Sequence, residues 1–192
     1  MQGDLSVTGN AEADALLNTN PLALLLGMLL DQQVPMEWAF VGPFRLKERM
    51  GGTLDAHAIA SMPEDEFLAV CKGPAAIHRF PGSMGKRVQA VCQTIVAEYD
   101  GDASRIWSDA ENGADLRKRL EALPGFGAEK SRIFIALLAK RMGVQPDGWQ
   151  EAAGPFGDDT PRSVADIDSA ETLARVREWK QARKKEGNTK TD

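Results

Sequence analysis

The sequence LPGFGAEK at Leu123–Lys130 stands between two amphipathic segments and decides the fold around it. Residues 115–122, DLRKRLEA, place Leu116 and Leu120 four positions apart among charged side chains, which is typical of a surface helix. Residues 130–142, KSRIFIALLAKRM, carry apolar side chains on one helical face. The stretch therefore predicts a helical hairpin over about 115–142.

The turn of this hairpin has the composition of a phosphate site. Pro124 and Gly125 end the first helix, and Gly127 is expected to supply a backbone conformation that other residues avoid. Such a turn presents unpaired backbone N–H groups at the start of the second helix, which suit a phosphate oxygen. Many helical hairpins turn on glycine without binding anything, so both interpretations stay open at this point.

Composition limits the function classes. The 192 residues are 43% hydrophobic and 27% charged, with a net charge of −5 and a pI of about 5.2. An acidic chain is unlike a non-specific nucleic-acid coat protein, although a local basic face is compatible with it. Cys71 and Cys92 cannot make a four-cysteine zinc or iron–sulfur site, and they favour a reduced setting. His57 and His78 have no carboxylates at metal-binding spacing, so each is expected to be solvated or to cap a helix.

The rest of the chain predicts an all-α fold in a single domain, residues 1–186, followed by a flexible end, 187–192. The central element is Leu22–Gln32, which is apolar nearly all round and is preceded by the start signal Asn20-Pro21. The apolar run is too short to span a bilayer. Leu5 and Val7 are expected in a short strand or a packed arm. A helix is also predicted over Met84–Tyr99, and the last helix, 169–185, becomes basic toward its end.

Three features together resemble the helix-hairpin-helix (HhH-GPD) superfamily of base excision DNA glycosylases, as a small member. LPGFG at Leu123–Gly127 fits the family's hairpin pattern. Asp147 lies 18 residues beyond Glu129 (147 − 129 = 18), which is the family's usual separation between the lysine position and the catalytic aspartate. LLDQQVP at Leu29–Pro35 is similar to the end of the family's buried helix. The resemblance implies an all-α glycosylase fold that covers most of the chain.

The resemblance also implies roles for individual residues. Gln33 falls where the family places the side chain that fills the space left by an extruded base, and Asp147 would be the catalytic carboxylate. The hairpin would bind DNA through Gly125, Phe126, Gly127, Lys130 and Arg132. Trp38, Phe40 and Phe44 are candidates for a base pocket, although their spacing equally suits core packing.

The departures from the family pattern concern the chemistry. Bifunctional members carry a Schiff-base lysine two residues after the second hairpin glycine, where this chain has Glu129. Lys130 is the next residue, and one residue on a helix turns a side chain by about 100°. A monofunctional enzyme without lyase activity is therefore expected, and no cofactor, because the cysteine count excludes the family's iron–sulfur cluster. Asp158 and Asp159 are the alternative candidates for the catalytic carboxylate.

The predicted function is hydrolysis of the N-glycosidic bond of a flipped damaged or mismatched base in double-stranded DNA. Two alternatives remain: a non-catalytic helix-hairpin-helix DNA-binding protein, and a helical protein-interaction module that uses the basic segment Arg175–Lys185. The family accepts alkylated, oxidised or deaminated bases, and the sequence does not choose among them. A monomer without membrane association is expected in the cytoplasm, on the nucleoid if the source is bacterial.

Overall fold

The computed structural model describes residues 2–186, so the predicted flexible end, 187–192, lies outside the described residues. All regular structure within 2–186 is helical, which confirms the predicted fold class. The elements in chain order are α1 (Ala11–Thr19), α2 (Pro21–Leu30), α3 (Met36–Arg49), α4 (Ala56–Ser61), α5 (Glu64–Lys72), α6 (Pro81–Tyr99), α7 (Arg105–Ser108), α8 (Gly113–Glu121), α9 (Ala128–Arg141), α10 (Trp149–Ala153), the 3₁₀ helices η1 (Gly154–Gly157) and η2 (Val164–Asp166), and α11 (Ala170–Glu186).

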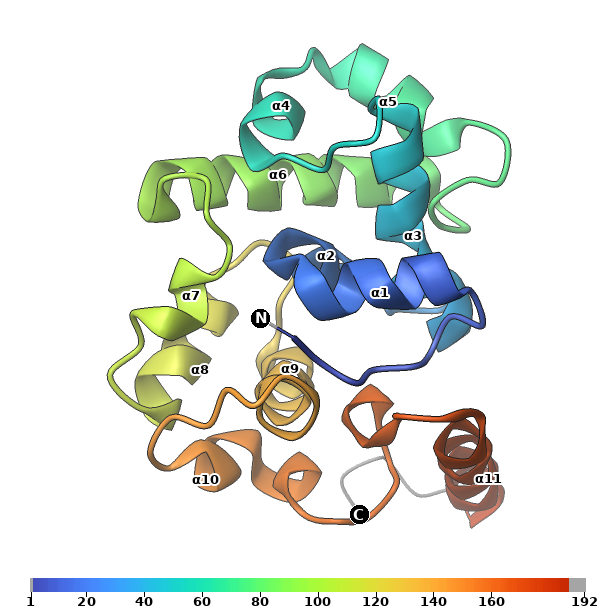
Figure 1. Cartoon of the computed structure of the whole chain (residues 1–192), viewed down its shortest axis with the longest axis vertical. Coiled ribbons are helices and arrows are strands. Elements are labelled where there is room, and N and C mark those ends of the chain that lie inside the picture. The colour runs from blue at the N-terminus through green and yellow to red at the C-terminus, as the bar shows by residue number, and fades with distance from the viewer. Residues whose placement is uncertain (1, 187–192) are drawn as a thin grey trace.

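Helix α2 is the centre of the molecule, as its composition predicts. Every residue from Leu22 to Leu30 is buried. The Asn20 side chain caps the helix by accepting the N–H of Ala23 at 2.9 Å, and Pro21 occupies the first turn, where its missing N–H costs nothing. Figure 1 shows α2 behind α1, with α3 running upward beside them, an upper layer formed by α4 to α6 and a lower layer formed by α8 to α11.

The upper layer is built on α6, against which α4 and α5 pack. The buried Gln89 of α6 ties α4 to it by donating its amide to the carbonyls of Ile59 (3.1 Å) and Met62 (2.7 Å). Helix α6 begins at Pro81, three residues before the predicted start, because proline is well suited to the first helical turn. The loop 73–80 that leads into α6 runs along α3.

The lower layer is built on α9, which contacts α8, α10 and η2. The buried Phe134 of α9 packs edge-on against Trp107 and Phe126, with ring centroids 6.0 Å apart in each pair. At the other end of α9, the Lys140 ammonium pairs with the carboxylate of Asp166 at 2.7 Å, and both side chains are largely buried. The helical hairpin is therefore anchored on both its turn and its open end.

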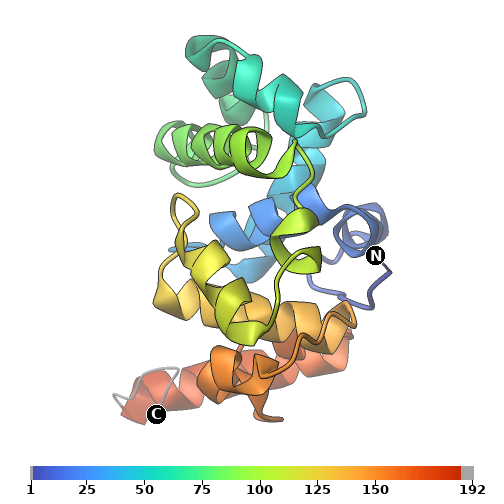
Figure 2. The same cartoon turned by 90° about the vertical axis from the view of Figure 1, so that its left-hand side faces the viewer.

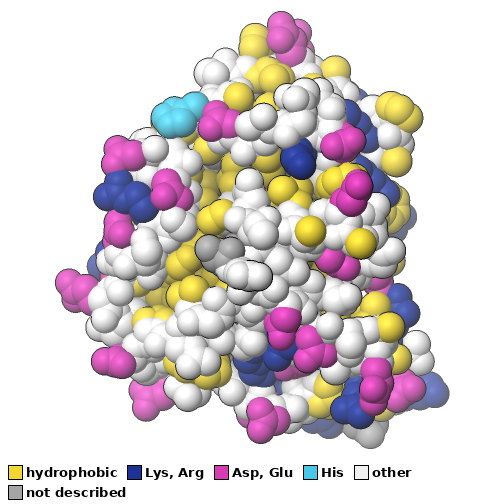
Figure 3. All heavy atoms as spheres, in the orientation of Figure 1, with side chains coloured by type: hydrophobic (Ala, Val, Ile, Leu, Met, Phe, Trp, Pro, Cys, Tyr) yellow, Lys and Arg dark blue, Asp and Glu magenta, His cyan; other side chains and the backbone are white. Residues whose placement is uncertain are grey.

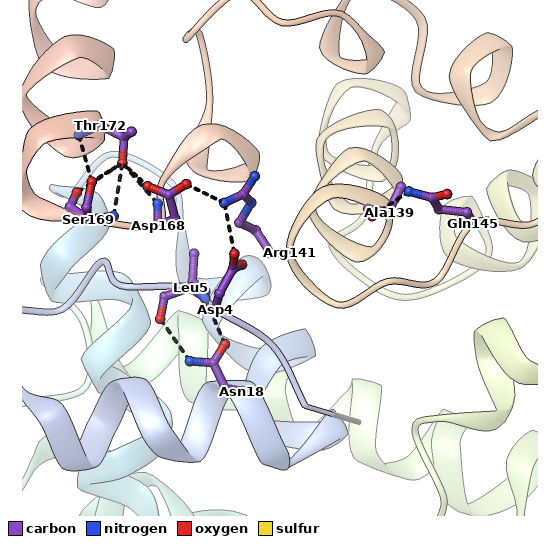
Figure 4. Close-up of polar contacts among 9 residues, drawn as sticks. All are labelled: Asp4, Leu5, Asn18, Ala139, Arg141, Gln145, Asp168, Ser169 and Thr172. Carbon is purple, nitrogen blue, oxygen red and sulfur yellow. Dashed lines mark hydrogen bonds and ion pairs between the residues drawn. The ribbon is translucent and has the colours of Figure 1, made fainter.

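The N-terminal segment is a packed arm rather than a strand. Leu5 and Val7 are buried, and the Asn18 amide group bonds both the N–H and the carbonyl of Leu5 at 2.9 Å. Figure 4 shows how Arg141 then holds the arm to the start of α11, through Asp4 (3.4 Å) and Asp168 (2.8 Å). The arm thus joins the first, ninth and last helices.

Within residues 2–186, no single helix is long and apolar enough to cross a membrane. Helices α1 and α2 meet that test only as a pair, and they are bent by 113° at Asn20. The same residues contain no group of three or more His, Cys, Asp or Glu side chains that could hold a metal ion.

Candidate nucleic-acid interface

The turn of the helical hairpin is a compact loop with an open outer surface. Leu123 and Phe126 are buried, and the Phe126 N–H donates to the Leu123 carbonyl at 3.1 Å. Gly125 has a φ of +84°, so it is this glycine that supplies the left-handed conformation. Gly127 has a φ of −95° and a ψ of 176°, an ordinary extended backbone, which corrects the role predicted for it from sequence.

The contribution of Gly127 is space rather than conformation. It precedes the first turn of α9, no side chain caps that helix, and a Cβ placed on Gly127 would meet no atom within 4 Å. The first N–H groups of a helix have no partner within it, and they carry partial positive charge. An exposed phosphate group can therefore approach the amides that follow Gly127 directly. The exposed Glu129 lies in this same turn.

The turn is fastened to the buried end of α2. The Lys130 ammonium donates to the carbonyls of Met28 (2.9 Å) and Leu29 (2.7 Å), which are among the last of that helix, and lies 5.9 Å from the centre of the Phe126 ring. A Cβ on Gly125 would come within 2.8 Å of Leu29 Cδ1, so the loop sits directly on α2. Lys130 and Phe126 thus hold the turn in place, and Lys130 is not directed at an external phosphate.

Directly after α2, a tight turn presents Gln33. This residue is exposed with a φ of +58°, a conformation that side-chain-bearing residues rarely adopt. Within residues 2–186 no hydrogen bond engages its side-chain amide. Its neighbour Gln32, in contrast, is fixed at three atoms. Gln32 Nε2 donates to the Leu29 carbonyl at 3.0 Å, Arg87 Nη1 donates to Gln32 Oε1 at 2.7 Å, and His78 bonds the Gln32 carbonyl at 2.9 Å.

Two exposed residues that the sequence did not single out, Arg87 and Phe80, complete this surface, and the buried His78 lies beneath it. Arg87, on α6, reaches Gln32, and its Cδ lies 3.7 Å from a Cβ built on Gly125, so it spans from the Gln33 turn to the hairpin. Phe80 is 45% exposed, which is unusual for a large apolar side chain, and the Arg79 guanidinium lies 5.3 Å from its ring centre. His78, predicted to be solvated or capping, is buried between Phe80 and Gln32. The only sequence feature that could have drawn attention to this loop is Arg79-Phe80-Pro81, and it gives no indication that the Phe80 ring is exposed.

The predicted base-pocket aromatics do not come together. Phe40 is fully buried in the core, with no exposed surface to offer a base. Phe44 is half-buried and lines a cavity of about 520 Å³ beside α1. Trp38 is 36% exposed, and its indole N–H donates to the Ala76 carbonyl at 3.2 Å. Phe40 therefore belongs to the core, which is the alternative that its spacing also allowed. Trp38 instead holds the loop that contains Ala76.

The structure does not bring Asp147 to the hairpin turn. The Asp147 carbonyl accepts the N–H of Gly113, the first residue of α8, at 2.7 Å, whereas the turn follows the last residue of α8. The 14 residues of α9 rise about 20 Å between the turn and the loop that carries Asp147. The Asp147 side chain is exposed and lines a cavity of about 410 Å³ with Asn112, Arg117 and Glu151. Asp147 has the family's sequence separation from Glu129, but the path of the chain after α9 places it at the other end of the hairpin.

The side chains of the remaining candidates lie against other elements than the turn. Arg132 runs beside η1, with its Cδ 3.8 Å from a Cβ built on Gly154. Asp158 accepts a hydrogen bond from Arg162 at 2.7 Å, and Asp159 lines a cavity of about 590 Å³ near Lys140 and Arg141. The candidate interface therefore comprises the hairpin turn, the Gln33 turn and the Phe80 loop.

Figure 2 shows the hairpin turn on the left of the molecule, opposite α1 and the N-terminal arm, with the C-terminal end of α11 projecting on the same side. Figure 3 shows the face that carries α1, where acidic and basic side chains are interspersed and no field of one sign forms. On the hairpin side, Arg79 and Arg87 are both exposed. The net acidity of the chain is thus compatible with local positive charge beside the turn.

A comparison with protein families matches residues 26–191 to the family described as HhH-GPD superfamily base excision DNA repair protein. The match starts inside α2 and includes the Gln33 turn, the Phe80 loop and the hairpin. A search of curated proteins finds no match.

Proposed function

Because the chain belongs to the HhH-GPD superfamily of base excision DNA repair proteins, we propose that it is a DNA N-glycosylase acting on a damaged or mismatched base in duplex DNA. In that reaction the bond between the base and C1′ of the deoxyribose breaks, water adds to C1′, and the base leaves with a proton. The nucleotide must first swing out of the stack, which costs a few kcal/mol and least for a damaged or mismatched base.

The observation that carries this proposal is the presentation of Gln33. Its side chain is exposed and its amide is unengaged within the described residues, while the backbone is held in the left-handed region by contacts to Gln32. A strained backbone at an exposed residue lowers the stability of the fold, and such strain is typical of residues that bind a ligand. A side-chain amide can both donate to and accept from the base left without a partner, so Gln33 suits the space that an extruded nucleotide vacates.

The hairpin would hold the backbone of the same strand. The amides after Gly127 are uncapped and open to a phosphate, and Arg87 lies between them and the Gln33 turn. Phe80, on the same surface, offers an apolar ring that can rest against neighbouring bases. These three groups together would grip the duplex on both sides of the flipped nucleotide.

Hydrolysis without strand cleavage is the expected chemistry. Glu129 occupies the position at which the family's bifunctional members carry a lysine, and the Lys130 ammonium is bonded to two carbonyls of α2. A Schiff base needs an amine that is deprotonated and able to reach C1′. Glu129 has no amine, and the Lys130 amine is engaged with α2, which supports a monofunctional enzyme.

The carboxylate that would stabilise the positive charge on the sugar has two candidates. Asp147 is the one implied by the family's spacing, but it lies at the far end of the helical pair from the turn. Asp31 is half-buried at the end of α2, two residues before Gln33, and its N–H bonds to the carbonyls of Gly27 (3.1 Å) and Met28 (3.3 Å). Position relative to Gln33 and the hairpin favours Asp31.

A base-release assay tests the proposal. Duplexes carrying uracil, an alkylated purine, oxidised guanine, or adenine opposite oxidised guanine would be incubated with the protein and with the variants Gln33→Ala, Asp31→Asn and Asp147→Asn. We expect strand breaks only after alkali, and their loss in Gln33→Ala and Asp31→Asn but not in Asp147→Asn. Breaks without alkali would contradict the monofunctional assignment.

Activity lost in Asp147→Asn alone would restore the family's aspartate to the site. No release from any duplex, with DNA binding intact, would favour a non-catalytic DNA-binding protein. That second candidate has specific support, since Glu129 replaces the lysine and Asp147 lies away from the turn.

A further inference from the structure

His78 is a buried histidine that connects two exposed parts of the candidate interface. It is 1% exposed, and both of its ring nitrogens are engaged. The Phe80 N–H donates to Nδ1 at 3.0 Å, and Nε2 lies 2.9 Å from the Gln32 carbonyl oxygen. A backbone N–H can only donate, so Nδ1 must be the acceptor and Nε2 must carry the proton that bonds Gln32. One neutral tautomer therefore satisfies both partners at once.

The loop 73–80 that carries His78 is itself tied to α3, which begins just after the Gln33 turn. Three α3 side chains donate to its backbone and to the last turn of α5. Trp38 and Arg45 bond the Ala76 carbonyl at 3.2 and 2.9 Å, and Arg49 bonds the carbonyls of Val70, Pro74 and Ala75 at 2.7 Å each. Ala75 has a φ of +59°, a second left-handed residue that such contacts must maintain.

We propose that His78 is a positioning residue that locks the Gln33 turn and Phe80 into one rigid unit, which enters DNA at two points. Gln33 would occupy the vacated place in the stack, and Phe80 would press on the bases beside it. The inference rests on the proposed function, because it assumes that Gln33 inserts into DNA. It adds that insertion depends on a residue that never touches DNA.

The physical reason is preorganisation. A left-handed turn with an exposed side chain would relax toward commoner backbone conformations unless its neighbours fix it. The His78 bond to the Gln32 carbonyl is the contact that ties this turn to the Phe80 loop. Ordering both segments before DNA arrives removes an entropic cost from binding, so loss of the bond weakens insertion more than general DNA affinity.

Two substitutions separate the two bonds of the ring. In His78→Asn the side-chain oxygen can take the place of Nδ1 and accept the Phe80 N–H, but the side chain is too short to reach Gln32. In His78→Gln the terminal amide can reach the Gln32 carbonyl. The two variants are similar in polarity, so they serve as matched controls for each other.

The test uses a probe that needs no knowledge of the natural lesion. A duplex containing a tetrahydrofuran abasic residue, with 2-aminopurine opposite it, already has a vacant place in the stack. Binding is measured against the same duplex without the abasic residue, and 2-aminopurine fluorescence reports insertion beside it. Thermal unfolding of each variant is recorded in parallel.

We expect the wild-type protein to bind the abasic duplex more tightly than the intact one. In His78→Asn this ratio of affinities should fall about tenfold, which is the size of an ordinary coupling between contacting residues, and the fluorescence change should disappear. Binding of the intact duplex stays the same, and His78→Gln keeps most of the preference. In a Gln33→Ala background, His78→Asn has no further effect.

The inference would be overturned if His78→Asn and Gln33→Ala reduced the preference for the abasic duplex additively. It would also be overturned if His78→Asn weakened binding of both duplexes equally and lowered the melting temperature of the protein. If the wild-type protein shows no preference for the abasic duplex, the proposed insertion step itself fails, and the inference fails with it. The two failures are therefore told apart by the wild-type measurement.

Discussion

Replacing Lys130 by methionine distinguishes a lysine that holds the fold from one that binds DNA. Its ammonium bonds the carbonyls of Met28 and Leu29 at 2.9 and 2.7 Å, and the side chain is half-buried. Methionine has similar length and apolar character but no donor, so the variant leaves two carbonyls at the end of α2 without this partner. The hairpin turn also loses its polar link to the central helix.

The expected cost follows from these contacts. Two hydrogen bonds from a charged donor, partly screened by solvent, contribute about 2–3 kcal/mol to the free energy of unfolding. In a chain of this size, 1 kcal/mol lowers the melting temperature by about 2–4 °C, so Lys130→Met is expected to lower it by about 5–10 °C. Urea unfolding followed by circular dichroism at several urea concentrations measures the free energy directly.

DNA binding by Lys130→Met is measured as the dependence of its affinity for an intact duplex on salt concentration. A lysine that neutralises one phosphate contributes about 0.9 to the slope of log K against log salt concentration. Because the Lys130 ammonium points to α2, the slope is expected to equal that of the control Lys47→Met, which makes the same charge change beside α1. Unchanged stability with a slope reduced by about 0.9 would refute the assignment of Lys130 to the fold.

Four further predictions address the turn residues, the exposed aromatic and the cysteines. Gln33→Gly relieves a φ of +58° and should alter the free energy of unfolding by less than about 1 kcal/mol, while abasic-duplex preference disappears; a larger loss of stability would give Gln33 a structural role. Gly125→Ala should destabilise by about 1–2 kcal/mol because of its φ of +84° and the nearby Leu29, whereas Gly127→Ala should fold normally and bind duplex DNA less tightly; equal stability of the two variants in urea would contradict this. Phe80→Ala should change stability by less than about 0.5 kcal/mol and weaken abasic-duplex binding without altering its salt slope, and a changed slope would argue against stacking. Burial raises the pKa of the Cys71 thiol to about 12 and also raises that of Cys92, so the folded state keeps protons that the unfolded state releases. Stability should therefore be level below a pH of about 9 and fall as pH rises toward 12, and iodoacetamide should label both thiols only on unfolding; rapid labelling at pH 8 would show that the thiols are accessible.

Local signals in the sequence were sufficient for the hairpin and the central helix. The apolar run after Asn20-Pro21 predicts a buried central helix, and every residue from Leu22 to Leu30 is buried in the structure. The LPGFG turn joins two amphipathic helices as predicted, although Gly125 rather than Gly127 has the positive φ. These features depend on neighbouring residues, whose geometry follows from backbone sterics and helical periodicity.

The aspartate and the aromatic residues show where such reasoning stops. Counting 18 residues beyond Glu129 located Asp147 in the sequence, but the Gly113 amide binds its carbonyl at the far end of α8. Trp38, Phe40 and Phe44 share one helix, yet one holds a loop, one is core and one faces α1. The environment of a side chain depends on which segments pack beside it, and those segments are distant in the sequence.

The sequence by itself determined the all-α fold class, the helical hairpin and the position of Gln33 at the end of the buried helix, because each follows from interactions within a few residues. Only the tertiary structure decided which groups share the surface around Gln33. His78 reaches Gln32 across 46 positions, Arg87 across 55, and Lys130 reaches Met28 across 102. Contacts at such separations arise when the core of α2 draws the loops and the hairpin together, and no local pattern encodes that outcome.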